Sequence, residues 1–472
     1  MLGLFGTLNL ASRALQTQMT GVEVAGQNLA NVNTTGYTRQ SVEIQTSPDI
    51  STTIGPEGTG ANAVAIQQIV NAVLNSQIQS QQSTSGYWSA QQSALQSAQT
   101  SLDEFLNGTG SATSSANSTT DTGLSGQLSG LFSAFQAVAT SPTSISARQA
   151  LIGQAQTLAS TFNQINSQLD SARASLNTSL NNDVDSANQL LSGIATLNQQ
   201  ISTADFSGAT PNDLLDEREQ DLENLSNLTN ITTSTGTNGA VDVSIGGQTL
   251  VSGNQVLDTL KTYDAGGGQL LVQMATGGAN LTLTGGSIQG TIDARDGELA
   301  TMQSSVNTLA STLITQVNTI HGGGYNLTGT NGANFFNGSD AATITVNSAL
   351  ADNPALIQAS GRASATGDNS VALQLADLAS AAQSGLSNQT FGDSYDETVA
   401  ALGNSLQSAN NQVSNQTAVS NMLSTQRSSV SGVNVDEEMT NLMSFQRAYE
   451  ASAELVNTVN TMMGDVLAMK NS

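Results

Sequence analysis

Several residue types are absent or scarce in this chain of 472 residues, and each shortage excludes a class of function. There is no cysteine, so disulfide bonds, thiolate metal sites and cysteine nucleophiles are impossible. There is one histidine, which leaves a single candidate for an imidazole ligand or general base. Aromatic residues make up 4% and prolines number 5, a composition that suits long helices better than a loop-rich sandwich.

Positive charge is also scarce, because 11 Lys and Arg face 36 Asp and Glu and give a formal net charge of −25. Binding to nucleic acid or to anionic lipid needs clustered cations, so we expect neither nucleic acid nor a membrane among the partners. No apolar run approaches the ~20 residues of a membrane span. The start, MLGLFGTLNLASRAL, has no cations before its apolar residues and predicts an amphipathic helix, not a cleaved signal.

Motifs for catalysis or cofactor binding are not found in the sequence. The glycine triplets at 266–268 and 322–324 lack the rest of a dinucleotide fingerprint, and neither lysine follows a glycine. His321 ends a helical run, and we interpret it as an imidazolium at a helix C-terminus, followed by a left-handed glycine. The acidic run from Asp216 to Glu223 is interpreted as the solvated face of a helix. We therefore expect no enzyme and no catalytic, cofactor-binding or metal-binding residues.

Periodicity predicts a mainly α-helical protein with one β-rich lobe. Helical patterns occupy about 61–106, 124–203 with a break near Pro142, 293–321 and 370–427. Residues 37–60 look extended or irregular because glycine and proline interrupt them. Between about 231 and 292, period-two runs such as AVDVSI and QLLVQM predict short strands and hairpins.

Amphipathic helices are predicted at both ends of the chain. The apolar positions of the first helix are Leu4, Leu8, Ala11, Leu15, Val22, Ala25, Leu29 and Val32. The last helix should begin at Asn434, an N-cap followed by three acidic residues in the first turn. Its seven-residue repeat is Val435, Leu442, Tyr449, Val456 and Met463. Periodicity alone leaves open whether these helices form an ordinary intramolecular bundle or also contact other subunits.

The predicted organisation has an inner part, a helical middle part and an inserted β lobe. Residues 1–45 and 430–472 would form the two halves of an inner coiled-coil domain. The middle domain would comprise 46–230 and 293–429, with the β-rich lobe at 231–292 between them.

The segment NLANVNTTGYTRQ, residues 28–40, resembles the N-terminal signature of the flagellar rod, hook and hook-associated proteins. The matching positions are Asn28, Asn31, Gly36 and Tyr37. The stretch from 431, with SGVNVDEE and then QRAY, is similar to the C-terminal helix of that family. Two internal stretches, 214–253 and 286–336, also resemble it, in the right order. Arg39-Gln40 and SGVNVDEE are most similar to the hook-associated members.

The resemblance implies a self-assembling structural subunit at the junction between hook and filament. Its implied partners are copies of itself in a ring, the hook protein, a second hook-associated junction protein and a flagellar export chaperone. It implies an extracellular location in the flagellum, reached without a cleaved signal. The implied assembly interface comprises Leu4, Leu8, Leu15, Val22, Asn28, Leu29, Asn31, Gly36, Tyr37, Val435, Leu442, Tyr449, Val456 and Met463.

Two alternatives stay open, another axial flagellar protein (rod or hook) and a secreted adhesin or binding module. The string SGVNVDEE argues against the first, and the lack of repeats and of a cleavable signal argues against the second. The chain also departs from the family pattern at two places. Gln68 and Asn71 stand where relatives often have Arg and Asp in a helix, which puts an ion pair there in doubt. Phe336 leads almost directly into ATITV, so we expect the large outer variable domain to be reduced or missing.

Overall fold

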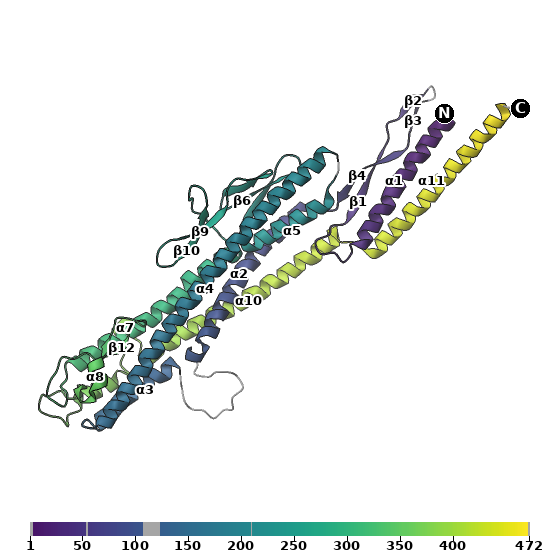
Figure 1. Ribbon diagram of the computed structural model, residues 1–472. Coiled ribbons are helices and arrows are strands. Elements are labelled where there is room, and N and C mark those ends of the chain that lie inside the picture. Colours follow the sequence, from purple (N-terminus) through teal and green to yellow (C-terminus); the bar gives the residue numbers. More distant parts are fainter. Residues whose placement is uncertain (1–2, 53–54, 107–122, 209, 471–472) are drawn as a thin grey trace.

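The computed structural model describes residues 3–52, 55–106, 123–208 and 210–470, and the molecule is strongly elongated (Figure 1). Its long helices are α1 (Leu4–Ala30), α2 (Ala72–Leu106), α4 (Ile145–Phe206), α10 (Phe391–Ser431) and α11 (Val435–Lys470). The two ends of the chain lie together, because α1 packs against α11. The predicted fold class, mainly α with paired terminal helices and β structure inserted in the middle, is confirmed.

The remaining elements are shorter. The helices are α3 (Leu124–Thr140), α5 (Asn212–Leu228), α6 (Gly286–Ala294), α7 (Ala300–Gly322), α8 (Ser348–Asp352) and α9 (Ser370–Asp377), with a π-helical stretch at Arg295–Leu299. The strands are β1 (Gln40–Thr46), β2 (Ile50–Thr52), β3 (Gly55–Glu57), β4 (Ala61–Gln68), β5 (Ile231–Thr235), β6 (Val241–Ile245), β7 (Gln248–Ser252), β8 (Gln255–Val256), β9 (Leu260–Asp264), β10 (Leu270–Met274), β11 (Phe336–Asn337) and β12 (Thr345–Val346).

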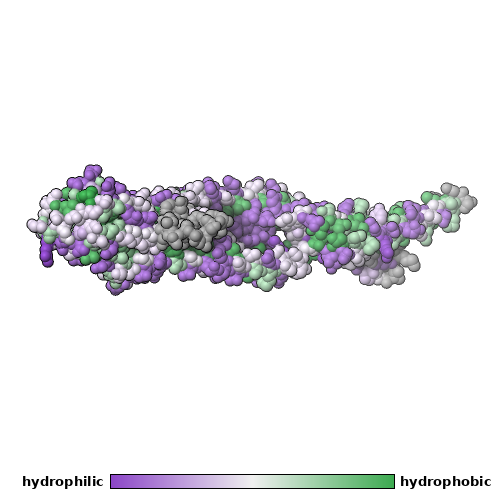
Figure 2. Space-filling model, turned by 90° about the horizontal axis from the view of Figure 1, so that it is seen from below, coloured by the Kyte–Doolittle hydropathy of each residue, from purple (hydrophilic) through white to green (hydrophobic). Residues whose placement is uncertain are grey.

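Two parts of the molecule can be distinguished by their packing. We call α1, α11 and β1 to β4 the terminal unit, and α2 to α10 with β5 to β12 the helical body (Figure 1). From below, the surface is mostly hydrophilic, with a hydrophobic patch where the helical body gives way to the terminal unit (Figure 2). No described helix is long and apolar enough to span a membrane.

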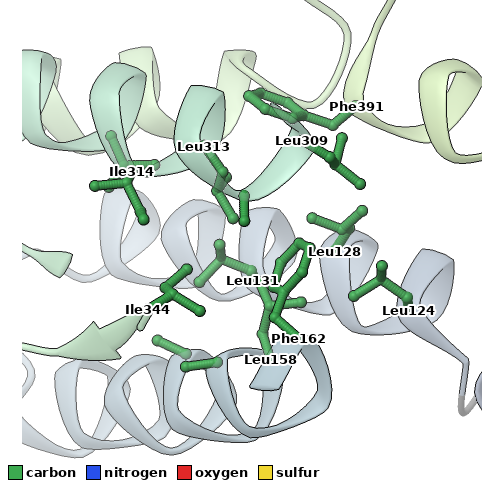
Figure 3. Close-up of a cluster of buried hydrophobic side chains, with 14 of the residues drawn as sticks. Leu124, Leu128, Leu131, Leu158, Phe162, Leu309, Leu313, Ile314, Ile344 and Phe391 are labelled. Carbon is green, nitrogen blue, oxygen red and sulfur yellow. The ribbon is translucent and has the colours of Figure 1, made fainter. Parts of the chain in front are cut away.

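The largest core lies at the end of the helical body that is far from the chain termini. Apolar residues three or four apart on α3, among them Leu124, Leu128 and Leu131, face Leu158 and Phe162 of α4 and residues of α7 (Figure 3). The chain breaks between α3 and α4 as predicted, and the Ser144 side chain accepts a hydrogen bond from Ala147 N to cap α4.

His321 belongs to this core and not to an exposed helix end. Its Nδ1 lies 2.8 Å from the Ala333 carbonyl, and its Nε2 accepts a hydrogen bond from the Gln358 N–H at 3.0 Å. Burial is the main cause that lowers the pKa of His321 to about 4, so the ring is neutral at pH 7. The predicted imidazolium is wrong, and so is the left-handed glycine, because Gly323 ends the helix with a φ of −79°.

The β lobe forms a second core against α4. Its sheet has the order β5-β6-β7-β8, with β9 and β10 as a separate antiparallel pair. Val243, Ile245 and Leu250 bury their side chains with Leu191 and Ile194 of α4. The strands predicted from AVDVSI and QLLVQM are confirmed as β6 and β10. The period-two run NLTLTG, residues 280–285, also predicted a strand, but it forms only an isolated bridge at Asn280, and residues 286–292 are the start of α6. Gly286 allows this, since its φ is +80° and a Cβ there would lie 2.3 Å from Thr229 N.

The helix predicted from residue 61 was placed too early. Residues 61–68 are β4, which pairs antiparallel with β1 from Gln40↔Gln68 to Thr46↔Ala61, and α2 begins at Ala72. Pairing with a strand and packing against α1 override the helical preference of an Ala- and Gln-rich segment. The predicted division between residues 45 and 46 falls inside β1.

Candidate assembly site: the joint and the terminal helices

The terminal unit meets the helical body at a joint built mainly from polar side chains. The chain passes between the two parts twice, at 69–71 and at 432–434. The loop after α1, the first turns of α5 and α11, and the last turns of α10 come together there (Figure 1). The family-like segment 28–40 therefore lies at the joint.

Asn28 is the centre of a hydrogen-bond network on the terminal side of the joint. Its Oδ1 accepts hydrogen bonds from the Tyr37 hydroxyl at 2.9 Å and from Gln40 N at 3.0 Å. Its Nδ2 donates to the Gln40 carbonyl at 2.8 Å and to Glu438 Oε2 at 3.1 Å. The residue is 1% exposed, and only an amide offers two donors and two acceptors here.

Glu438 ties the start of α11 to the same network. Its side chain is 3% exposed, and its Oε1 accepts a hydrogen bond from Arg39 Nε at 2.8 Å. Arg39 also pairs through Nη1 with the exposed Glu437 at 2.6 Å. The predicted cap of α11 is confirmed, since Asn434 Oδ1 accepts hydrogen bonds from Asp436 N and Glu437 N. The first turn of α11 is thus held by its cap and by the N-terminal loop.

Asp216 of α5 links the helical body to the terminal unit. Its two carboxylate oxygens accept hydrogen bonds from Thr38 N at 3.0 Å and from Gln68 Nε2 at 2.8 Å. Asn212 strengthens the contact by donating to the Ile66 carbonyl at 2.9 Å. Burial is the main cause that raises the pKa of Asp216. Gln68, which sequence analysis placed in a helix, lies in β4 and donates to this carboxylate from there.

The acidic run on α5 is not a solvated face, so that interpretation was wrong. The Glu223 side chain is buried and pairs with Arg427 of α10. Glu219 accepts a hydrogen bond from Gln79 of α2 at 3.0 Å, and burial raises its pKa. These carboxylates attach α5 to neighbouring helices. Among the described residues, no group of three or more acidic or histidine side chains could hold a metal ion.

The other signature residues shape the loop beside a cleft of about 290 Å³ between the loop, α5 and α10. Gly36 has a φ of +82°, a conformation that favours glycine. Asn31 Oδ1 accepts a hydrogen bond from the Thr34 hydroxyl at 3.0 Å. Burial, followed by Asp213 and other carboxylates, raises the pKa of Tyr37 to about 12, which keeps its hydroxyl a hydrogen-bond donor.

The predicted apolar stripe of α11 flanks the buried seam instead of forming it. The seam against α1 follows a different seven-residue frame, in which Glu438 and Val459 are buried and Phe445 is half-buried. Leu442, Val456 and Met463 are half-buried, whereas Val435 and Tyr449 are each 40% exposed. The stripe is therefore only partly covered within one chain.

Among the apolar positions predicted for α1, only Ala11 and Ala25 are fully buried. Leu4, Leu8, Leu15, Val22 and Leu29 are all half-buried. Four further residues of α1 are fully buried, namely Thr17, Gly21, Val24 and Asn28. Thr17 lies toward β4, because its hydroxyl donates a hydrogen bond to the Ala61 carbonyl at 3.1 Å.

Gly21 and Phe445 are in close contact between the terminal helices. A Cβ on Gly21 would lie 2.6 Å from Cδ1 of the Phe445 ring, so the ring packs directly on the backbone of α1. The sequence offered one signal for this seam, the small residues Gly21 and Ala25 spaced one helical turn apart. The heptad pattern gave more weight to the larger side chains on either side of them.

Comparison with known protein families finds flagellar proteins along most of the chain. The family described as "Flagellar hook-associated protein FlgK helical domain" matches residues 110–336. "Flagella basal body rod protein" matches residues 8–38, and "Flagellar basal body rod FlgEFG protein C-terminal" matches residues 424–469. The last two matches cover most of the two terminal helices and part of the joint.

Individual relatives agree with these families. Flagellar hook-associated protein 1 of Bacillus subtilis (strain 168) is 27% identical over 514 residues, which cover 99% of this chain and 98% of the relative. The protein of the same name from Escherichia coli (strain K12) is 24% identical over 434 residues, 72% of this chain and 79% of the relative. The flagellar hook junction protein FlgK from Burkholderia pseudomallei shares the fold, with a TM-score of 0.62 and 19% identity over 75% of this chain and 100% of that one.

Proposed function

Because this chain belongs to the flagellar rod, hook and hook-associated proteins, and within them matches hook-associated protein 1, we propose that it is a structural subunit of the junction between hook and filament. The observation that carries the proposal is the match of the middle of the chain to the hook-associated helical domain, with rod-type matches at both ends. The role is mechanical and not catalytic.

Within this role the terminal unit would form the inner domain of the assembly. The apolar stripe from Val435 to Met463 is partly uncovered, and burying apolar surface against a neighbour contributes about 25 cal/mol per Å². Leu4, Leu8 and Leu15 on α1 are likewise half-buried and could lose more water on assembly. We propose that both helices contact neighbouring copies in a ring, in addition to each other.

The joint would set the direction of the terminal helices relative to the helical body. Hydrogen bonds to Asp216 and Glu438 depend on angle as well as distance, so they favour one orientation more sharply than apolar contacts do. The inner domain would therefore end after β4, at residues 69–71, and not at residue 45, where the division would cut β1; its second half would begin at 432–434. The link between β11 and β12 is short, which supports a reduced or missing outer domain.

The proposed partners are the hook protein on one side, a second hook-associated junction protein on the other, and an export chaperone before assembly. The proposed location is outside the cell in the flagellum, reached without cleavage of a signal.

Deleting residues 434–472 tests this function. The deletion removes α11 and its stripe but none of the residues of the three buried hydrophobic clusters, so the helical body should still fold. We expect cells with hooks but without filaments, flagellin lost to the medium and no swimming. Immunogold labelling of the full-length chain should mark only the boundary between hook and filament. Normal filaments in the deletion strain, or label along the hook or rod, would contradict the proposal.

A further inference from the structure

Two apolar features of the chain are exposed, because none of the described residues covers them. Phe206, the last residue of α4, is 92% exposed. On the first turns of α11, Val435, Met439 and Met443 are each about half exposed, and we call these three residues the methionine patch. Contiguous apolar surface such as the methionine patch marks interaction sites, whereas single exposed apolar residues are common on any protein.

The two features lie at the same level of the molecule but on opposite sides. In Figure 1 the end of α4 and the start of α11 are level with each other along the long axis, with α5 and the joint between them. A second copy placed beside the first by a rotation about an axis along its length would bring Phe206 of one copy toward the patch of the other. Such a head-to-tail contact uses two different surfaces, and its repetition arranges copies around a common axis, in a ring or a helical array.

The charges beside the two features are complementary. Asp205 precedes Phe206 and is exposed, whereas Arg447 follows Met443 by one helical turn and is exposed. Arg447 has no ion pair among the described residues, in a chain where only 11 cations face 36 acids. An exposed arginine is the natural partner for an acidic residue on a neighbouring copy.

We propose that Phe206 of one copy inserts into the methionine patch of the next copy, with Asp205 facing Arg447. Methionine side chains adapt to an aromatic ring and add a favourable sulfur contact. A buried aromatic side chain covers roughly 150–250 Å², against about 800 Å² per partner in a stable interface. This area is too small to hold two copies together by itself. The contact would instead align neighbouring copies with each other, as one part of a larger interface formed by the terminal helices. It rests on the proposed function, because it requires copies to be neighbours.

Disulfide trapping tests the contact directly, because the chain has no cysteine of its own. A chain with Phe206→Cys and Met439→Cys should cross-link between copies in isolated, oxidised flagella and give a ladder of multimers. A bond within one chain is excluded, since the two positions lie on opposite sides of the molecule and a disulfide needs Cα atoms less than about 7 Å apart. Both positions are exposed, so neither change should unfold the protein.

The matched control combines Phe206→Cys with Met462→Cys. Met462 is also a methionine of α11 and, like Met439, 50% exposed, but it lies roughly 34 Å further along the helix. It should give no ladder. Phe206→Asp should weaken association of the copies by about tenfold, as loss of an interface anchor does.

The outcomes separate the contact from the function. If the cysteine variants reach the boundary between hook and filament and the Phe206/Met439 pair gives no ladder, or no more than the Phe206/Met462 pair, the contact is wrong and the junction role stands. If the wild-type chain itself is missing from that boundary, the proposed function fails.

Discussion

Replacing Glu438 by alanine should release the first turns of α11 without disturbing the helical body. Removal of the carboxylate leaves one Asn28 Nδ2 hydrogen bond unmade and deprives Arg39 of its buried partner. Removing one member of a buried ion pair costs about 3–5 kcal/mol, and we expect the lower end because Arg39 keeps its bond to Glu437. About 3 kcal/mol corresponds to roughly a hundredfold increase in local opening. Amide hydrogen exchange should be faster by that factor in residues 37–40 and 438–442 and unchanged in α4.

Glu437→Ala is the matched control, since Glu437 is the neighbouring residue and pairs with the same arginine. Its side chain is 59% exposed, and exposed ion pairs contribute about 0–1 kcal/mol, so exchange should rise by less than about fivefold. Equal exchange in Glu438→Ala and wild type would refute the idea that the joint holds α11. An equally large effect of both variants would show that charge near the helix N-terminus matters, and not the buried network.

Two further changes probe the terminal pair and the distal core. Gly21→Val places a side chain into the Phe445 ring and should destabilise the α1–α11 contact by about 1–3 kcal/mol, which amide hydrogen exchange would show as faster exchange in α1 and α11. The control Gly26→Val places its side chain in open space and should leave exchange unchanged. Equal exchange in both variants would contradict the packing of Phe445 on Gly21. The pKa of His321 is lowered to about 4, so its stabilising contribution is present above pH 6.5 and lost as the pH falls toward 4. When the pH is lowered from 7 to 4, the free energy of unfolding measured in urea should fall in wild type by up to about 3 kcal/mol more than it falls in His321→Gln. Identical pH profiles for the two proteins would contradict a buried neutral ring.

Local patterns in the sequence were sufficient for the elements that depend on local interactions. The break near Pro142, the cap at Asn434 and the strands of the β lobe follow from residues within a few positions of each feature. Pairing of the terminal helices was also predictable, because both helices carry apolar positions at heptad spacing and each needs a partner surface.

The elements that were predicted wrongly depend on distant parts of the chain. The segment of β4 has a helix-like composition, and only its pairing with β1 makes it a strand. The start of α6 depends on the close approach of Gly286 to the backbone of Thr229. Neither contact leaves a periodic signal in the segment itself.

The seam of α11 shows a different limit. Two seven-residue frames compete on this helix, and the frame of Val435 and Tyr449 is the more apolar by sequence. The structure buries the frame of Glu438 and Phe445 against α1, because Arg39 and Asn28 satisfy the carboxylate and Gly21 makes room for the ring. A hydrophobic pattern places a glutamate outside a buried seam, because burying a charge without partners is costly. The correct frame can therefore be chosen only when the partners of Glu438 on α1 and the following loop are known.

This choice of frame has a consequence for assembly. If the frame of Val435 and Tyr449 were buried against α1, the most apolar surface of α11 would be covered within a single chain. Instead, a network of hydrogen bonds at Asn28 and Glu438 fixes α11 so that Val435 and Tyr449 stay 40% exposed. All three buried hydrophobic clusters lie in the helical body, so the terminal unit has little apolar core of its own. The polar joint therefore orients a helix pair whose remaining apolar surface is available to neighbouring copies.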